Sequence, residues 1–299
     1  MRGGIGKDSV SERLVHAIFF LCSVLSILIM LGIVVVIVTE SLGFFREVSI
    51  WEFLTDTQWT PLFTEKHFGI LPLLNGTLLV ALGSALVSIP TGSLIAIYLS
   101  EYASSRVKGI IKPVLEVLAG IPTVVYGYFA LTFITPVILK HVFTDVMTFN
   151  AASASIVVGI MTLPMVASVS EDALSSVPQS LREGAYALGA RKIHVVLGIV
   201  YRAALSGVLA SYILALSRAI GETMAVTIAA GATPRLTLNF LESIQTMTAY
   251  IVQVSLGDTP FGTIEYKTIF AVALVLFIIT LSMNIISNWI SSRYRRMYQ

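Results

Sequence analysis

The 299 residues are 56% apolar and only 12% charged, with a formal net charge of +2, and the mean hydropathy is +0.87. Because soluble domains carry roughly 25% charged residues, this composition excludes an ordinary water-soluble protein and indicates one that crosses a membrane several times. The single cysteine, Cys22, excludes an internal disulfide and offers no metal-site spacing.

Six apolar segments are long enough to span the hydrocarbon core of a bilayer. An aromatic-rich loop, residues 39–68, follows the first of them, and it is expected to form an interfacial belt, a small external subdomain or a cover packed on helix ends. The sequence therefore predicts an all-α membrane protein with six transmembrane helices. The predicted spans cover about residues 14–38, 69–100, 113–139, 151–169, 195–231 and 268–290.

Six spans place both ends of the chain on one side of the membrane, and Lys and Arg are concentrated in the loops of that side. The positive-inside rule then predicts that both termini and the loop at 170–194 are cytoplasmic. The expected organisation is an N-terminal part with the first span and external loop (1–70), a helical core (71–291) and a short basic tail (292–299).

The loop at 170–194 is predicted to contain a short helix. Residues 176–179 and 180–183 read Ser-x-x-Gln and Ser-x-x-Glu, two overlapping capping boxes. Leu181, Ala185 and Leu188 fall on one narrow apolar stripe. Such a thin helix can insert into a cleft on another protein or lie on lipid headgroups.

An arginine and a carboxylate lie deep in the fifth apolar segment. Arg218 follows Arg202 by sixteen residues, which in one helix is about 24 Å and near the middle of a core about 30 Å thick. A charge at that depth needs a partner or a wet cavity, and Glu222 is expected one turn later on the same helix face.

Two interpretations of this pair remain open. It can be a closed ion pair that only fixes helix packing, or it can lie on the path of an anion. The planar fork of Arg218 suits a tetrahedral oxyanion, and Glu222 favours one that carries a proton, such as phosphate, over sulfate. Thr223, Thr123 and Tyr126 are further candidates for hydroxyl contacts on the path, although each is also a common helix-packing residue.

The cytoplasmic loop has the spacing of a known motif. Glu183, Ala185, Gly189 and Ile199 fall at positions 1, 3, 7 and 17 of the EAA loop that is typical of ABC importer permeases. The sequence departs from that loop at Gly184, Tyr201 and Arg202.

A combination of four further stretches is more specific. The chain carries Gly-Ile-Leu-Pro at 69–72, Asn-Gly-Thr at 75–77, Gly-Ile-Pro-Thr-Val-Val-Tyr-Gly at 120–127 and Ser-Arg-Ala-Ile-Gly-Glu-Thr-Met-Ala-Val at 217–226. From about Phe68 onward it resembles the PstC-type permeases of bacterial phosphate-specific ABC importers, and Gly-Glu-Thr-Met-Ala-Val favours that type over the PstA type.

The resemblance implies an ABC type I importer permease core, formed by helices 2–6, in the bacterial inner membrane. It implies a homologous PstA-type permease, a cytoplasmic ABC ATPase dimer and a periplasmic phosphate-binding protein as partners, besides lipid, with inorganic phosphate as cargo and no nucleic acid. The helix at 183–191 would dock on the ATPase. The residues expected to couple are Glu183, Ala185, Leu188, Gly189, Ala190 and Arg191.

No phosphate-binding loop of the form Gly-x-x-x-x-Gly-Lys-Ser/Thr occurs in the sequence. We therefore expect a non-hydrolytic subunit that binds no cofactor or metal itself, with ATP and Mg²⁺ used by the partner ATPase. The alternatives are an importer for another oxyanion or small solute, and a stand-alone secondary transporter or anion channel that uses Glu222 as a proton site.

Overall fold

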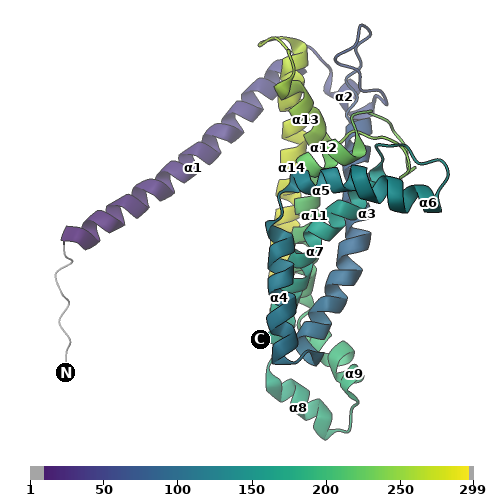
Figure 1. The fold of residues 1–299 in the computed structure, drawn as a ribbon. Coiled ribbons are helices and arrows are strands. Elements are labelled where there is room, and N and C mark those ends of the chain that lie inside the picture. Colours follow the sequence, from purple (N-terminus) through teal and green to yellow (C-terminus); the bar gives the residue numbers. More distant parts are fainter. Residues whose placement is uncertain (1–9, 296–299) are drawn as a thin grey trace.

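The computed structural model describes residues 10–295, which form helices and loops without a β-sheet (Figure 1). Within that range, five helices are long and apolar enough to cross a membrane: Leu14–Phe45, Leu71–Tyr102, Thr123–Val142, Ala151–Ser175 and Ile264–Ile290. A bent pair, Lys192–Ala203 and Leu205–Ile220, makes a sixth if it is counted as one span. The all-α membrane fold is confirmed, while the domain boundaries and the cytoplasmic placement of the termini stay predictions.

The helices occur along the chain in the following order. They are α1 (Val10–Phe45), α2 (Ile50–Thr55), α3 (Leu71–Ile97), the π-helical turn η1 (Tyr98–Tyr102), α4 (Ser105–Gly120), α5 (Thr123–Phe129), η2 (Ala130–Leu139), α6 (Lys140–Val142), α7 (Ala151–Ser175), α8 (Gln179–Ala187), α9 (Lys192–Val195), η3 (Val196–Val200), α10 (Tyr201–Ala203), α11 (Leu205–Ile220), α12 (Met224–Ala230), α13 (Met247–Leu256) and α14 (Ile264–Arg295).

Helix α7 lies at the centre of the bundle, packed against α3 on one side and α11 on another. Glycines allow the close approach to α3: a Cβ on Gly159 would come within 2.6 Å of Val87, and one on Gly92 within 2.8 Å of Val166. The hydroxyls of Ser170 and Ser211 join α7 to α11 at 2.7 Å. Small residues therefore set the helix spacing, as is usual inside membranes.

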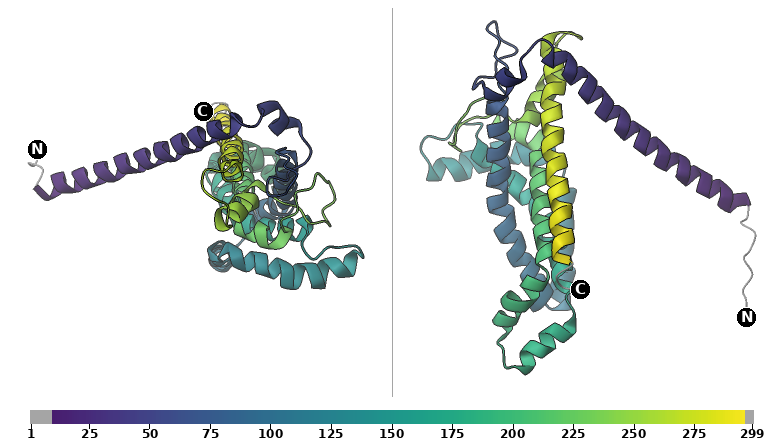
Figure 2. Two further views of the ribbon diagram at one scale, coloured as in Figure 1. Left: turned by 90° about the horizontal axis from the view of Figure 1, so that it is seen from above. Right: turned by 180° about the vertical axis from the view of Figure 1, so that it is seen from behind.

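Helix α1 leaves the bundle at its C-terminal end and projects away from it (Figure 2). Its contacts are made with α14 near that end, where the Ser41 hydroxyl donates to the Phe270 carbonyl at 2.8 Å. The side chains of its middle part, between Leu14 and Val36, are mostly exposed and apolar. Such a surface suits lipid or another apolar helix rather than water.

The aromatic loop after α1 packs on the end of the bundle. Phe44, Phe53, Trp59 and Phe68 are buried in one cluster, and the Trp59 ring meets Tyr250 of α13 edge to face at 4.9 Å. The loop is thus a cover on helix ends, one of the three expected arrangements.

The prediction of one continuous span over 113–139 is wrong. Helix α4 begins earlier, at Ser105, and ends at Gly120, after which α5, η2 and α6 run across the bundle (Figure 1). The cause is Pro122, which lacks an amide proton and forces the residue before it out of the helical region. Ile121 accordingly has an extended ψ of 129°.

The prediction of one continuous helix over 195–231 is also wrong. The chain bends by 70° between the segments that end at Ala203 and begin at Leu205, and it breaks again where α11 ends with its C-cap at Gly221. Hydroxyls brace the first bend, because Tyr201 lies 2.9 Å from Tyr212. Tyr212 in turn lies 2.6 Å from Ser93 of α3.

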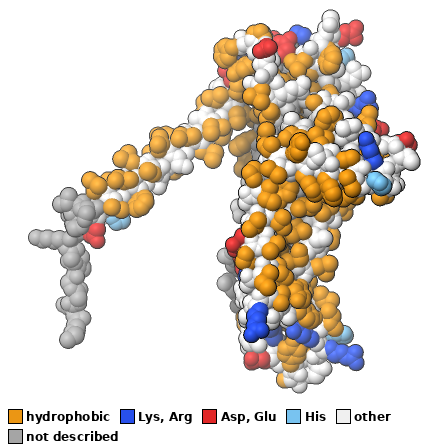
Figure 3. Space-filling view, viewed as in Figure 1, with side chains coloured by type: hydrophobic (Ala, Val, Ile, Leu, Met, Phe, Trp, Pro, Cys, Tyr) orange, Lys and Arg blue, Asp and Glu red, His pale blue; other side chains and the backbone are white. Residues whose placement is uncertain are grey.

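On the face shown in Figure 3, hydrophobic side chains cover α1 and most of the bundle. Lys and Arg side chains gather at the end that carries α8 and α9 (Figure 3). This distribution matches an apolar belt with a basic end.

Candidate functional site

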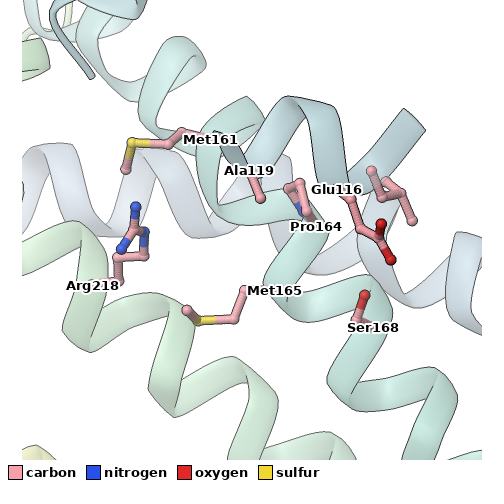
Figure 4. A pocket seen from close by; sticks show the side chains of 8 residues that line it. Glu116, Ala119, Met161, Pro164, Met165, Ser168 and Arg218 are labelled. Atoms are coloured by element: carbon pink, nitrogen blue, oxygen red, sulfur yellow. The ribbon is translucent and has the colours of Figure 1, made fainter. Parts of the chain in front are cut away.

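Arg218 lies in the last turn of α11, and its side chain is exposed. It lines a cavity of about 320 Å³ that is open on one side. Figure 4 shows Arg218 on one side of this cavity and Glu116 and Ser168 on the other. The complete lining is Leu115, Glu116, Ala119, Met161, Pro164, Met165, Ser168 and Arg218.

The cavity is formed where three helices meet. Helix α4 contributes Glu116, α7 contributes Met161 and Met165, and α11 contributes Arg218. Arg202 and Arg218 do not lie on one straight helix as the sequence prediction assumed, because the chain bends by 70° after Ala203, and the depth of Arg218 in the membrane stays a prediction. The structure places the Arg218 guanidinium in the lining of a partly open cavity that has both polar and apolar side chains.

Glu222 does not face Arg218 from one continuous helix, contrary to the sequence prediction. Gly221 ends α11, so that Glu222 lies between α11 and α12, where its side chain is buried. Its Oε1 accepts the backbone N–H of Ala225 at 3.1 Å, which caps the first turn of α12. No ion pair joins Arg218 and Glu222 in the described part of the chain.

The three hydroxyl candidates lie outside the cavity lining. The buried Tyr126 donates to the carbonyl of Leu118 at 2.7 Å and so ties α5 to α4 across the break between them. Thr223 donates to the Gly221 carbonyl at 3.2 Å. Thr123 begins α5 and is half-buried. The hydrogen bonds made by Tyr126 and Thr223 thus lie at the breaks between helices.

Sequence reasoning missed the position of Glu116 and of the two methionines. The ammonium of Lys112, in the preceding turn of α4, lies 2.7 Å from Glu171 of α7. The hydrogen bond to Glu171 raises the pKa of Lys112 above its ordinary value. The position of Glu116 depends on the α4–α5 break, which Pro122 signals in the sequence.

The cytoplasmic loop predicted from the motif contains two helices rather than one. Helix α8 ends at Ala187 and Arg191 is the N-cap of α9, so the predicted helix over 183–191 is wrong in extent. The predicted capping boxes are absent, because Pro178 is the N-cap of α8 and no side chain caps it.

Gly189 makes the turn between these helices with a φ of +79°. Its N–H donates to Tyr186 O at 2.9 Å and the N–H of Ala190 donates to Ala185 O at 3.2 Å, which is the usual closure of a helix by a left-handed glycine. The six coupling candidates divide between two environments. Ala185 is buried and Ala190 is half-buried, whereas Glu183, Leu188, Gly189 and Arg191 are exposed.

Leu188 is 90% exposed, although the periodicity placed it on one stripe with the buried Ala185. The helix ends before Leu188, so the stripe is not continuous. The loop between α8 and α9 thus presents an exposed leucine beside a glycine turn.

The chain is similar to known proteins both in sequence and in fold. Residues 88–296 match the family model described as "Binding-protein-dependent transport system inner membrane component". The chain belongs to this family. The permease is thus a multi-pass protein of the inner membrane, and the family consists of transport-system membrane components rather than hydrolases.

Curated relatives extend the match over most of the permease. It is 33% identical to a probable ABC transporter permease protein, YqgH, of Bacillus subtilis, over 95% of this chain and 96% of that protein. It is 33% identical to the phosphate transport system permease protein PstC of Haemophilus influenzae, over 79% of each. The resemblance drawn from the motifs is therefore confirmed.

Solved structures show the same fold in this permease. A chain of a bacterial alginate ABC transporter, in complex with an alginate pentasaccharide-bound periplasmic protein, matches with a TM-score of 0.63 over 99% of this chain and 98% of that chain at 16% identity. A chain of the MetNI methionine ABC transporter matches with a TM-score of 0.56 over 76% of this chain and 94% of that chain at 16% identity. The fold is that of type I ABC importer permeases, as expected.

Proposed function

We propose that this chain is one permease subunit of an ATP-driven importer of inorganic phosphate. Its partners are a homologous PstA-type permease, a cytoplasmic ABC ATPase dimer and a periplasmic phosphate-binding protein. ATP and Mg²⁺ act at the ATPase, and this chain binds neither. The similarity to PstC proteins supports the cargo.

The observation that carries the proposal is the exposed guanidinium of Arg218 in the open cavity. A guanidinium donates two parallel hydrogen bonds to a tetrahedral oxyanion. Because the cavity is only partly enclosed by this chain, a homologous permease lying against it would complete a pathway between the two subunits. Arg218 would then stabilise phosphate as it passes between them.

The coupling loop supports the ATP-driven part of the proposal. The exposed Glu183, Leu188 and Arg191 are the side chains we assign to contact with the ATPase. Movement of the ATPases on nucleotide binding would shift α8 and α9 and bias the bundle between two states. Hydrolysis would reset it.

The test is ATP-dependent uptake of radiolabelled phosphate by the assembled complex in proteoliposomes. We expect Arg218→Gln to abolish uptake while the ATPases stay bound, and Arg202→Gln, a matched loss of charge outside the cavity, to retain it. Wild-type uptake by Arg218→Gln would refute the role of Arg218. Uptake of another solute in preference to phosphate would refute the cargo.

A stand-alone carrier is tested in the same vesicles. Purified without its partners, the chain is expected to move no phosphate on an ion gradient. Transport under that condition would favour the secondary transporter or channel.

A further inference from the structure

The cavity holds a second charged side chain, whose sign is opposite to that of Arg218. Glu116 projects from α4 on the far side of the cavity and is exposed (Figure 4). In the described part of the chain, neither Glu116 nor Arg218 makes a hydrogen bond or an ion pair through its side chain. Two opposite charges therefore lie at opposite ends of one cavity lining without forming an ion pair with each other.

Helix α4, which carries Glu116, is attached to its neighbours on both sides of this residue. At one end Lys112 is bound to Glu171 of α7 at 2.7 Å, and its ammonium also interacts electrostatically with Glu116. At the other end the Tyr126 hydroxyl holds the Leu118 carbonyl at 2.7 Å. Glu116 lies between these two attachments.

The cavity that both residues line is large enough for a hydrated oxyanion. Its volume of about 320 Å³ is roughly ten times the share of liquid volume that one water occupies. Met161, Met165 and Pro164 form apolar walls, and apolar surroundings strengthen the interactions of the charges with anything bound between them.

We propose that Glu116 is a specificity-determining residue of the pathway, which admits an oxyanion held by Arg218 only if that anion carries a proton. Any tetrahedral oxyanion attracts the guanidinium. A carboxylate repels a fully deprotonated anion such as sulfate, but it accepts a charge-assisted hydrogen bond from the O–H of phosphate. Glu222 cannot perform this selection here, because it is buried and engaged with Ala225.

This inference rests on the proposed function, and it is tested by protection of a reporter thiol in the assembled complex. Cys22 is replaced by Ser, and Ser168→Cys places one cysteine in the cavity lining. The rate at which a neutral maleimide labels this cysteine is measured with phosphate, sulfate or chloride at one ionic strength. In this parent, phosphate is expected to protect at lower concentration than sulfate.

We expect Glu116→Gln to reduce the preference for phosphate over sulfate by about tenfold, which is the worth of one hydrogen bond to a charged group. Glu116→Asp, which keeps the carboxylate, should retain most of the preference and shows that substitution at this position is tolerated. Asp172→Asn removes an exposed carboxylate of α7 outside the lining and should leave the ratio unchanged.

The two proposals fail in different ways. An unchanged ratio in Glu116→Gln, or equal protection by both anions in the parent, would overturn the role of Glu116 and leave phosphate import standing. Retained protection and retained phosphate uptake in Arg218→Gln would instead overturn the pathway itself.

Discussion

Arg182 of α8 and Glu101 of η1 form an almost buried ion pair, with 2.7 Å between Nη2 and Oε1 and with 11% and 7% of their side chains exposed. Arg182 also donates to the carbonyls of Leu174 and Val177. One guanidinium thus ties the coupling loop to the ends of α3 and α7. Motion of α8 must therefore pass to both helices.

The pair leads to the first prediction. Arg182→Gln leaves Glu101 buried without a cation, and we expect it to destabilise the folded protein by about 3 kcal/mol and to reduce phosphate uptake. Thermal unfolding in detergent measures the loss. The double variant Arg182→Gln with Glu101→Gln should be more stable than the sum of the single losses, and strict additivity would show that the contact carries no energy.

Gly189 supplies the second prediction. A side chain at its φ of +79° costs roughly 1–2 kcal/mol, so Gly189→Ala and Gly189→Asp should loosen the turn and reduce co-purification of the ATPase. Gly189→Asn should do less harm, because asparagine tolerates this region.

The matched control for Gly189 is Gly184→Ala. Gly184 lies inside α8 with open space where a Cβ would stand, so alanine there should preserve ATPase binding and stabilise the helix by about 0.5–1 kcal/mol. Equal losses from Gly184→Ala and Gly189→Ala would refute the role of the turn.

Glu222 gives a third prediction, which separates capping from a role in transport. Glu222→Gln keeps an oxygen to accept the Ala225 N–H, whereas Glu222→Ala does not, and we expect only the alanine variant to lose stability, by about 1 kcal/mol. Melting temperature and phosphate uptake are measured together. Loss of uptake in a fully stable Glu222→Gln would return this carboxylate to the pathway.

Gly76 supplies the fourth prediction. A Cβ there would lie 2.3 Å from the Gln245 carbonyl. The neighbouring Asn75 and Thr77 side chains accept hydrogen bonds from the backbone N–H groups of Thr237 and Met247 on either side of Gln245. Gly76→Ala should destabilise the protein by about 1–3 kcal/mol through overpacking. Gly109→Ala on α4 meets open space and should not lower the melting temperature.

The hydroxyls at the bend give the fifth prediction. Tyr212→Phe removes the hydrogen bonds of this hydroxyl to both Tyr201 and Ser93. We expect the variant to lower the free energy of unfolding by about 1 kcal/mol for each bond. The exposed Tyr128 provides the control, Tyr128→Phe. Equal melting temperatures for the two variants would show that the hydroxyls do not hold the bend.

The sequence predicts the membrane class, the approximate spans and the coupling loop, because apolar length and motif spacing are local properties. Pro122 and Gly221 also mark two helix breaks in the local sequence, although the predicted spans 113–139 and 195–231 extend past these residues. The bend after Ala203 has no such mark, since it depends on packing and on hydroxyls that meet from distant helices. The placement of Glu116 and Arg218 in the lining of one cavity likewise arises from the arrangement of α4, α7 and α11, which no local pattern encodes.

The attachment of α1 by one end has a mechanical consequence. A helix attached at only one end transmits little strain from its free portion, so the bundle can tilt at the end that carries α8 and α9 without moving the first helix. The hydrogen bond from Ser41 to Phe270 lies at the attached end of α1. Residues 14–36 can therefore keep their position while the remaining helices change their tilt relative to α1.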